Sequence, residues 1–225
     1  MGLILHLETS ANLCSAAIGL DGRLLSEAKT TEVMRHSKEI TLIIDRCVKE
    51  AGYTINDIEA VALSSGPGSY TGLRVGTSAA KAICYALDKP LIGINTLLCI
   101  ADYVRQTDSG KFKYIIPVID ARREEVYCAI YNQDLSPEVE MTNHILSEGS
   151  FSDYENVLVC GDAAEKVNKH LSRKDYQYRQ MDPLASYLIN LAYKKYQLKE
   201  FEDVAYFSPT YFKPPHITKS KKPLF

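Results

Sequence analysis

Residues 64–76 read Ser64-Ser65-Gly66-Pro67-Gly68-Ser69-Tyr70-Thr71-Gly72-Leu73-Arg74-Val75-Gly76, and the interpretation of the whole chain depends on them. The stretch leads from an apolar run at 60–63 into a helix that we expect over about 71–87, with Ser69 placed to cap it. Glycine-rich loops before a helix are typical of phosphate sites, because backbone N–H groups there point at the anion. The alternative is a sharp turn that only begins a helix.

Two common phosphate motifs do not match this loop. A P-loop has a lysine directly after its last glycine, whereas Leu73 follows Gly72 here. A dinucleotide-binding fingerprint has the spacing G-x-G-x-x-G, and the glycines at 66, 68 and 72 are one residue too widely spaced for it. The loop therefore does not by itself predict a nucleotide-binding enzyme.

The helix after the loop carries small or apolar residues around most of its circumference, which predicts burial on two sides. One side can face its own sheet, and the other can admit the backbone of a partner helix. Leu42 lies opposite the buried stripe of the preceding helix, at about 37–51, and extends this surface. We expect Gly76→Arg or Ala80→Arg to abolish association and leave the fold intact. The expected partner interface comprises Leu42, Gly72, Leu73, Gly76, Ala79, Ala80 and Ile83.

The runs on either side of the loop predict an α/β fold. Their order is strand, strand, strand, helix, strand, helix, strand, which is that of a ribonuclease-H-like unit, the half-molecule of actin-like ATPases and sugar kinases. Asp21-Gly22 predicts the first hairpin turn. The expected strands are 3–8, 14–20, 23–29, 60–63 and 91–94, and the expected helices are about 37–51, 71–87 and 96–105.

A second, abbreviated unit of the same kind is expected after a polar linker at 106–113. Its strands are predicted at 114–120, 126–131 and 157–160, and Asp162 is expected to cap the helix that follows. Pro183 is expected to open a later helix with an inner stripe of Leu184, Tyr187, Leu188, Leu191 and Leu198. The domains are therefore expected at 1–105 and 106–205, with a Pro- and Lys-rich tail at 206–225.

Composition excludes several classes of protein. The 225 residues carry a formal net charge of −2, so no broad basic footprint of an autonomous nucleic-acid binder is expected. No apolar run is long enough to span a membrane and no leader is recognisable, so we expect a cytoplasmic protein that binds no membrane. The six scattered cysteines predict reduced core thiols. The tail lysines at 213, 219, 221 and 222 either contact phosphates of a nucleic acid or form a solvated end.

Residues 64–76, together with Asp120-Ala-Arg-Arg-Glu-Glu-Val-Tyr127, make the chain resemble the TsaB family, formerly called YeaZ. The resemblance covers most of the chain. It implies two ribonuclease-H-like domains of the actin-like ATPase superfamily and a role in making threonylcarbamoyladenosine on tRNA. It further implies a non-catalytic partner that pairs through N-terminal helices with the metal-bearing paralogue TsaD, joined by the ATPase TsaE. The same helices are also available for a homodimer when the chain is alone.

The chemistry of the chain agrees with an inactive partner. A metal site like that of the paralogue needs two histidines four apart on a helix, and the helix from Thr96 to Arg105 has none. The histidines, at 6, 36, 144, 170 and 216, are too scattered for a local pair, and His36 is expected to cap or pack. No cofactor, metal or catalytic residue is therefore expected. A metallopeptidase is the least favoured reading.

An ATP-dependent enzyme of the same fold is the main alternative, because remnants of a phosphate site remain. The expected vestigial nucleotide or anion site consists of Glu8, Ser69, Asp120 and Arg122. Its second loop, Asp120 to Arg123, is too bulky for close approach to a phosphate. We expect its arginines to pair with Glu124, Glu125 or carboxylates of a partner.

Overall fold

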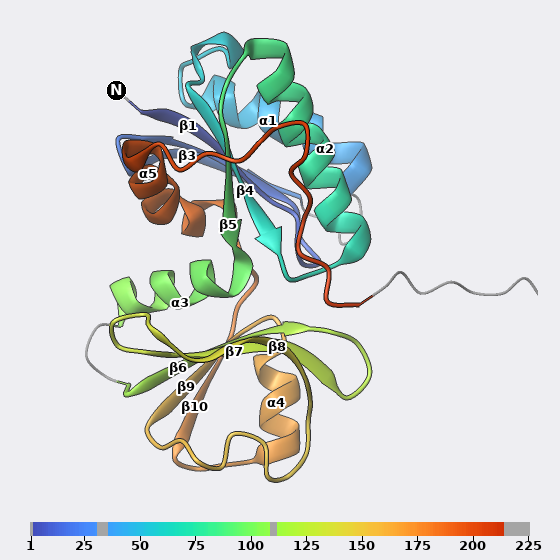
Figure 1. Ribbon diagram of the computed structural model, residues 1–225, viewed down its shortest axis with the longest axis vertical. Helices are drawn as coiled ribbons and strands as arrows, with labels where there is room; N and C mark the ends of the chain where they lie inside the picture. The colour runs from blue at the N-terminus through green and yellow to red at the C-terminus, as the bar shows by residue number, and fades with distance from the viewer. Residues whose placement is uncertain (1, 31–35, 109–111, 214–225) are drawn as a thin grey trace, which may run out of the picture.

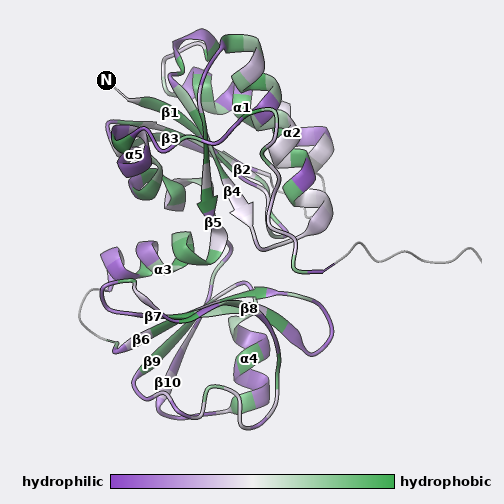
Figure 2. Cartoon of the chain, viewed as in Figure 1, coloured by the Kyte–Doolittle hydropathy of each residue, from purple (hydrophilic) through white to green (hydrophobic). Residues whose placement is uncertain are grey.

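The computed structural model describes residues 2–30, 36–108 and 112–213 and contains two five-stranded sheets, one in each half of the molecule (Figure 1). This confirms the expected α/β fold with two sheet-based units. Figure 2 shows that hydrophobic residues concentrate on the strands of both sheets. Among the described residues, no helix combines the length and the apolar character needed to cross a membrane.

The first sheet has the strand order β3-β2-β1-β4-β5. β1 pairs antiparallel with β2 and parallel with β4, so the carboxyl ends of β1, β4 and β5 meet at one edge. Helices α1 and α2 lie side by side over one face (Figure 1). The elements of this half are β1 (Leu3–Glu8), β2 (Ser15–Leu20), β3 (Arg23–Lys29), α1 (His36–Glu50), η1 (Ile55–Asp57), β4 (Ala60–Gly66), α2 (Tyr70–Leu87) and β5 (Leu91–Asn95).

Local sequence explains where these elements begin and end. The predicted apolar stripe of α1 is buried against the sheet, from Ile40 to Val48. α2 begins at Ser69, whose hydroxyl accepts the Gly72 N–H at 3.3 Å as the sequence predicted. The helix ends at Asp88, which adopts a left-handed conformation with φ of 51°.

The second sheet has the order β10-β9-β6-β7-β8. Helix α3 lies between the two sheets (Figure 1) and packs its apolar side on the second, whereas α4 covers the opposite face. The elements of this half are α3 (Thr96–Thr107), β6 (Tyr114–Asp120), β7 (Glu125–Asn132), β8 (Pro137–Ile145), β9 (Val157–Gly161), α4 (Ala164–Leu171) and β10 (Tyr176–Gln180), followed by η2 (Ala185–Leu188) and α5 (Ile189–Leu198).

The chain returns to the first half after β10, which differs from the expected second domain at 106–205. Tyr187 and Leu188 of η2 pack with Ile4 and Ile92 of the first sheet. The later helix thus covers the first sheet opposite α1 and α2. Its predicted inner stripe is correct for Tyr187 and Leu188 but wrong for Leu198, which is 69% exposed.

Residues 199–213, here called the strap, run from the edge of the first sheet along α2 toward the second half (Figure 1). The Glu202 N–H donates to the Leu91 carbonyl at 2.9 Å, and Lys81 of α2 donates to the Ala205 and Phe207 carbonyls at 2.9 and 3.2 Å. The predicted tail is therefore packed against the rest of the protein as far as Lys213, where the described residues end. The tail lysines at 219, 221 and 222 lie outside the described residues.

All six cysteines are buried and form no disulfide, as their apolar surroundings predicted. Burial raises the pKa of the Cys128 and Cys160 thiols to about 12, so both are protonated at neutral pH. They are inert core residues.

Candidate functional site

The glycine loop is closed by the chain's own backbone. Thr9 and Ser10, which follow β1, lie across the first turn of α2, and the Ser69 N–H donates to the Ser10 carbonyl at 2.6 Å. A side chain at Gly72 would overlap the Thr9 carbonyl oxygen, and one at Gly68 would overlap that of Ser10. These glycines are therefore required by close packing within the chain.

The strap closes the loop from the other side. The Thr210 N–H donates to the Ser65 carbonyl at 2.8 Å, and a Cβ at Gly66 would lie 2.8 Å from the Thr210 carbonyl oxygen. Gly66 also has φ of +105°, which side chains rarely adopt. Ser69 caps α2 rather than facing open space, so the loop offers little room for a phosphate in this conformation.

Part of the expected partner face is consequently wrong. Gly72, Leu73, Gly76 and Ala80 are buried within the chain, and a side chain at Gly76 would overlap the Thr9 hydroxyl. A partner cannot contact them in this conformation. Gly76→Arg or Ala80→Arg would disturb the fold, contrary to the expectation that they leave it intact.

A groove between α1 and α2 remains open beside this buried face. Its volume is about 570 Å³, and its apolar lining comes from Ile40, Val75 and Ala79. Ala79 and Ile83 of the predicted interface are half-buried, and Leu42 of α1 is 67% exposed. The other lining residues are Ser37, Thr41, Tyr70, Thr71, Arg74 and Ser78.

Glu8 ends β1 inside the protein and is completely buried. Its Oε1 accepts the Ser10 N–H at 2.6 Å and the Ser64 hydroxyl at 2.9 Å, whereas its Oε2 has no hydrogen-bond partner. Burial raises the pKa of this carboxyl. Glu8 therefore helps to hold the loop after β1, and among the described residues no group of three or more His, Cys, Asp and Glu side chains is arranged to bind a metal.

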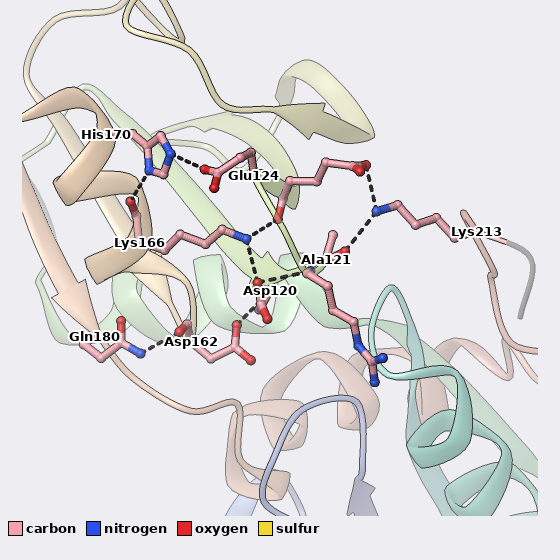
Figure 3. A network of polar contacts seen from close by, with 10 residues as sticks. Asp120, Ala121, Glu124, Asp162, Lys166, His170, Gln180 and Lys213 are labelled. Carbon is pink, nitrogen blue, oxygen red and sulfur yellow. Dashed lines mark hydrogen bonds and ion pairs between the residues drawn. The ribbon is translucent and has the colours of Figure 1, made fainter. Parts of the chain in front are cut away.

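Asp120 belongs to a polar network in the second half (Figure 3). Its carboxylate accepts from Lys166 of α4 at 2.8 Å, and its N–H donates to Asp162 Oδ1 at 2.8 Å. Asp162 thus does not cap α4 as predicted, because its side chain turns back toward β6; the residue before the helix is Ala163. Burial, with Asp120, Asp182 and Glu8 nearby, raises the pKa of Asp162 to about 7.

The turn after Asp120 presents Arg122 and Arg123 on the surface, both exposed. Of the expected partners, Glu124 and Glu125 are not paired with these arginines in the part of the chain that the structure describes, and pairing with carboxylates of a partner chain stays a prediction. Glu124 pairs with His170, and Glu125 pairs with Lys213 at 2.7 Å (Figure 3). Arg123 influences Glu125 only by helping to lower the pKa of that carboxyl.

The residues of the expected vestigial site come from both halves of the molecule, and Asp162, which accepts from the Asp120 N–H, is also close enough to Glu8 to be affected by its charge. Glu8 and Ser69 lie in the first half within the packed loop, whereas Asp120 and Arg122 lie in the turn of the second half. Sequence reasoning missed Thr9, Thr210 and Lys213 as the groups that close and bridge these regions. In the sequence, Gly72 and Gly76 indicate only that some group packs closely against α2. They do not indicate which residue supplies that group.

Comparison with known proteins identifies a family whose sequence model matches most of this chain. The family model described as TsaD, tRNA N6-adenosine threonylcarbamoyltransferase, matches residues 30–218. The chain is 30% identical over 131 residues to the tRNA threonylcarbamoyladenosine biosynthesis protein TsaB of Escherichia coli (strain K12), covering 58% of this chain and 55% of that protein. The first curated relatives are thus matched over about half their length, 55% and 51%.

Further similarities extend over more of the chain. The TsaB protein of Buchnera aphidicola is 27% identical over 194 residues, covering 83% of this chain and 91% of that protein. A solved structure titled as an uncharacterised protein with similarity to peptidase YEAZ from Pseudomonas aeruginosa has a TM-score of 0.79 at 22% identity, covering 95% of this chain and all of that one (100%). An activator of 2-hydroxyisocaproyl-CoA dehydratase from Clostridium difficile, with bound ADPNP, has a TM-score of 0.53 at 9% identity, covering 89% of this chain and 98% of that one. These structures share the fold.

Proposed function

The chain belongs to the TsaB (YeaZ) branch of the TsaD-type family, and we propose that it serves threonylcarbamoyladenosine biosynthesis on tRNA as a non-catalytic partner of a TsaD-type paralogue. In this proposal the paralogue performs the transfer, an ATPase of the TsaE type joins the complex, and tRNA is bound mainly through the assembly. The work is done in the cytoplasm, where tRNA is modified. The chain itself needs no metal or cofactor.

The observation that carries the proposal is the groove between α1 and α2. It combines an apolar lining from Ile40, Val75 and Ala79 with the 67%-exposed Leu42 on the adjoining helix. A helix of a partner fits between two parallel ridges of this kind. In this proposal the groove takes the place of the Gly72–Gly76–Ala80 face as the docking surface. Ala79 of the expected interface lines it, and Leu42 and Ile83 lie on the same two helices.

The closed glycine loop supports the non-catalytic part of the proposal. Transfer of a phosphoryl group needs backbone N–H groups free to approach a phosphate. Here Gly66, Gly68 and Gly72 approach Thr210, Ser10 and Thr9 of the same chain. Asp120 is held by Lys166, and Oε1 of Glu8 is held by the Ser10 N–H and the Ser64 hydroxyl, so both carboxyl groups already have partners within the chain.

Co-purification with the TsaD-type paralogue of the same organism tests the proposal. Ala79→Arg places a long charged side chain in the groove, and Ala82→Arg makes the same change at an exposed position of α2 outside it. We expect Ala79→Arg to weaken association about 100-fold or more and Ala82→Arg to change it less than about threefold. Circular dichroism and thermal melting confirm that both variants fold.

Two outcomes would contradict the proposal. Normal association of a folded Ala79→Arg variant would exclude the groove as the docking surface. Loss of a homodimer of the chain, with the paralogue still bound, would assign the groove to self-association instead. Calorimetry of the isolated chain with ATP separates the remaining alternative, since tight nucleotide binding would favour an ATP-dependent enzyme.

A further inference from the structure

The turn at Arg122 and Arg123 has an unfavourable backbone conformation for its residues. Both arginines have positive φ, 65° and 51°, where glycine and asparagine are accommodated at lower cost. Strain of this kind persists where the side chains serve a purpose. The sequence keeps two long cationic side chains at a position that favours small residues.

The carboxylates around the turn are already engaged by side chains other than the arginines. Asp120 accepts from Lys166, Glu124 pairs with His170, and Glu125 pairs with Lys213 and also accepts from Asn143 (Figure 3). Each of these carboxylates therefore has a side-chain partner other than the arginines. Both exposed guanidinium groups are left available for an external anion.

The strap carries two exposed aromatic residues, Tyr211 and Phe212, directly before Lys213, which binds the turn. Phe212 lies 5.9 Å from the ring of Tyr127, at the start of β7, and is 38% exposed; Tyr211 beside it is 39% exposed. Lys213 fixes this end of the strap by donating to the Ala121 carbonyl at 2.9 Å. The sequence after Lys213 contains three lysines and no aspartate or glutamate. Positive charge and aromatic surface thus meet at one point of a chain whose net charge is −2.

We propose that Arg122, Arg123, Tyr211 and Phe212, here called the turn–strap surface, bind a single-stranded segment of RNA. Guanidinium groups bind phosphates in a bidentate manner, and exposed aromatic rings stack on unpaired bases. The surface has charged and aromatic groups but no apolar groove, so RNA fits it better than a protein helix. The inference rests on the proposed function only through the choice of RNA. The turn–strap surface adjoins the α1–α2 groove at Tyr211, whose ring lies 4.9 Å from that of the groove residue Tyr70, whereas Arg122, Arg123 and Phe212 do not line the groove.

Binding of fluorescein-labelled, unmodified tRNA transcript tests the assignment, measured by anisotropy over a range of KCl concentrations. The proteins are the full chain alone and its complex with the TsaD-type paralogue. The test variant is Arg122→Asn/Arg123→Gly, which removes two charges and suits the positive φ values. The control, Lys174→Ala/Lys194→Ala, removes two charges from exposed positions elsewhere.

For the test variant we expect affinity to fall about tenfold and the slope of log affinity against log salt to shrink by roughly 1.5, as for loss of two phosphate contacts. The control should change both much less, and the thermal stability of the test variant should equal or exceed that of the unmodified chain. Phe212→Ala should weaken binding about fivefold with an unchanged salt slope.

RNA affinity and salt slope equal to those of the control would overturn the assignment. So would unchanged RNA binding accompanied by loss of the paralogue, since the arginines would then contact protein carboxylates. Failure of the proposed function has a different signature. In that case Ala79→Arg would associate normally, whatever the turn–strap variants do to RNA binding.

Discussion

The glycine loop at 64–76 joins β4 to α2 in the first half, and the turn at 120–125 joins β6 to β7 in the second half, and the two are built in opposite ways. The first is filled by the chain's own backbone, with Thr9 and Thr210 against its glycines. The second is exposed and carries Arg122 and Arg123 at positive φ. The glycine loop is thus closed by contacts within the chain, whereas the turn presents exposed charge.

The difference shows that glycine has two uses that the sequence alone does not separate. Close approach can be made by a ligand or by another part of the same chain. At Gly72 the approaching group is the Thr9 carbonyl. Substitutions in and around the two regions test whether the glycine loop is closed by the chain itself and whether the turn is exposed.

The largest expected effect is in the closed region. Gly72→Ala would place a methyl group against the Thr9 carbonyl and should destabilise the protein by about 1–3 kcal/mol. Gly149→Ala is the matched control, because no atom lies within 4 Å of its added Cβ, and it should change stability by less than about 1 kcal/mol. Urea unfolding measures both. Equal stability of the two variants would break the comparison.

In the second half, Asp162 should make stability depend on pH. Its pKa is raised to about 7 in the folded protein, so the unfolded state loses the proton first as pH rises. Stability contributed by this group is therefore complete below about pH 4 and is lost progressively up to about pH 7. Asp162→Asn keeps the Oδ1 acceptor for Asp120 and should be more stable than the unmodified chain at about pH 8 but not at about pH 4. Parallel urea midpoints at the two pH values would contradict this.

The smallest effect is expected where the strap crosses α2. Lys81→Met removes the hydrogen bonds to the Ala205 and Phe207 carbonyls and should change global stability by less than about 1 kcal/mol. Hydrogen exchange of residues 203–210 should nevertheless become faster, because the strap detaches locally. Lys38→Met, at an exposed position of α1, is the control and should leave that exchange unchanged.

Strong periodic patterns allowed the first half to be predicted well. The stripe of α1 follows from burial of one face, and the apolar runs of β1 and β2 follow from burial of nearly every residue in both strands. β8, at Pro137–Ile145, was missed because its residues are mostly exposed or half-buried and carry little apolar alternation. The packing of η2 and α5 on the first sheet was not predicted, because an apolar stripe shows that one side of a helix is buried but not against which sheet.

The site was predicted less completely than the fold. The small residues of α2 correctly indicated a buried side, at Gly72, Gly76 and Ala80, whereas Ala82 and Ala86 of the second predicted side are exposed. The group that approaches Gly72 and Gly76 is Thr9, which is distant in sequence. The partners of Arg122 were predicted from neighbours in sequence, Glu124 and Glu125. Tertiary structure supplies those carboxylates with His170 and Lys213 instead. The neighbour of the α2 glycines and the partners of Glu124 and Glu125 are therefore both set by contacts between residues far apart in the chain.

The most direct test of a docking rather than catalytic role is tRNA threonylcarbamoylation in a reconstituted mixture of the TsaD-type paralogue, the TsaE-type ATPase and this chain. Glu8→Gln preserves the Oε1 acceptor for Ser10 and Ser64 but removes the acid, and Ala79→Arg blocks the groove. We predict that Glu8→Gln retains the rate within about twofold, whereas Ala79→Arg gives the rate measured without the chain. A folded, paralogue-bound Glu8→Gln variant that loses the activity would contradict the account.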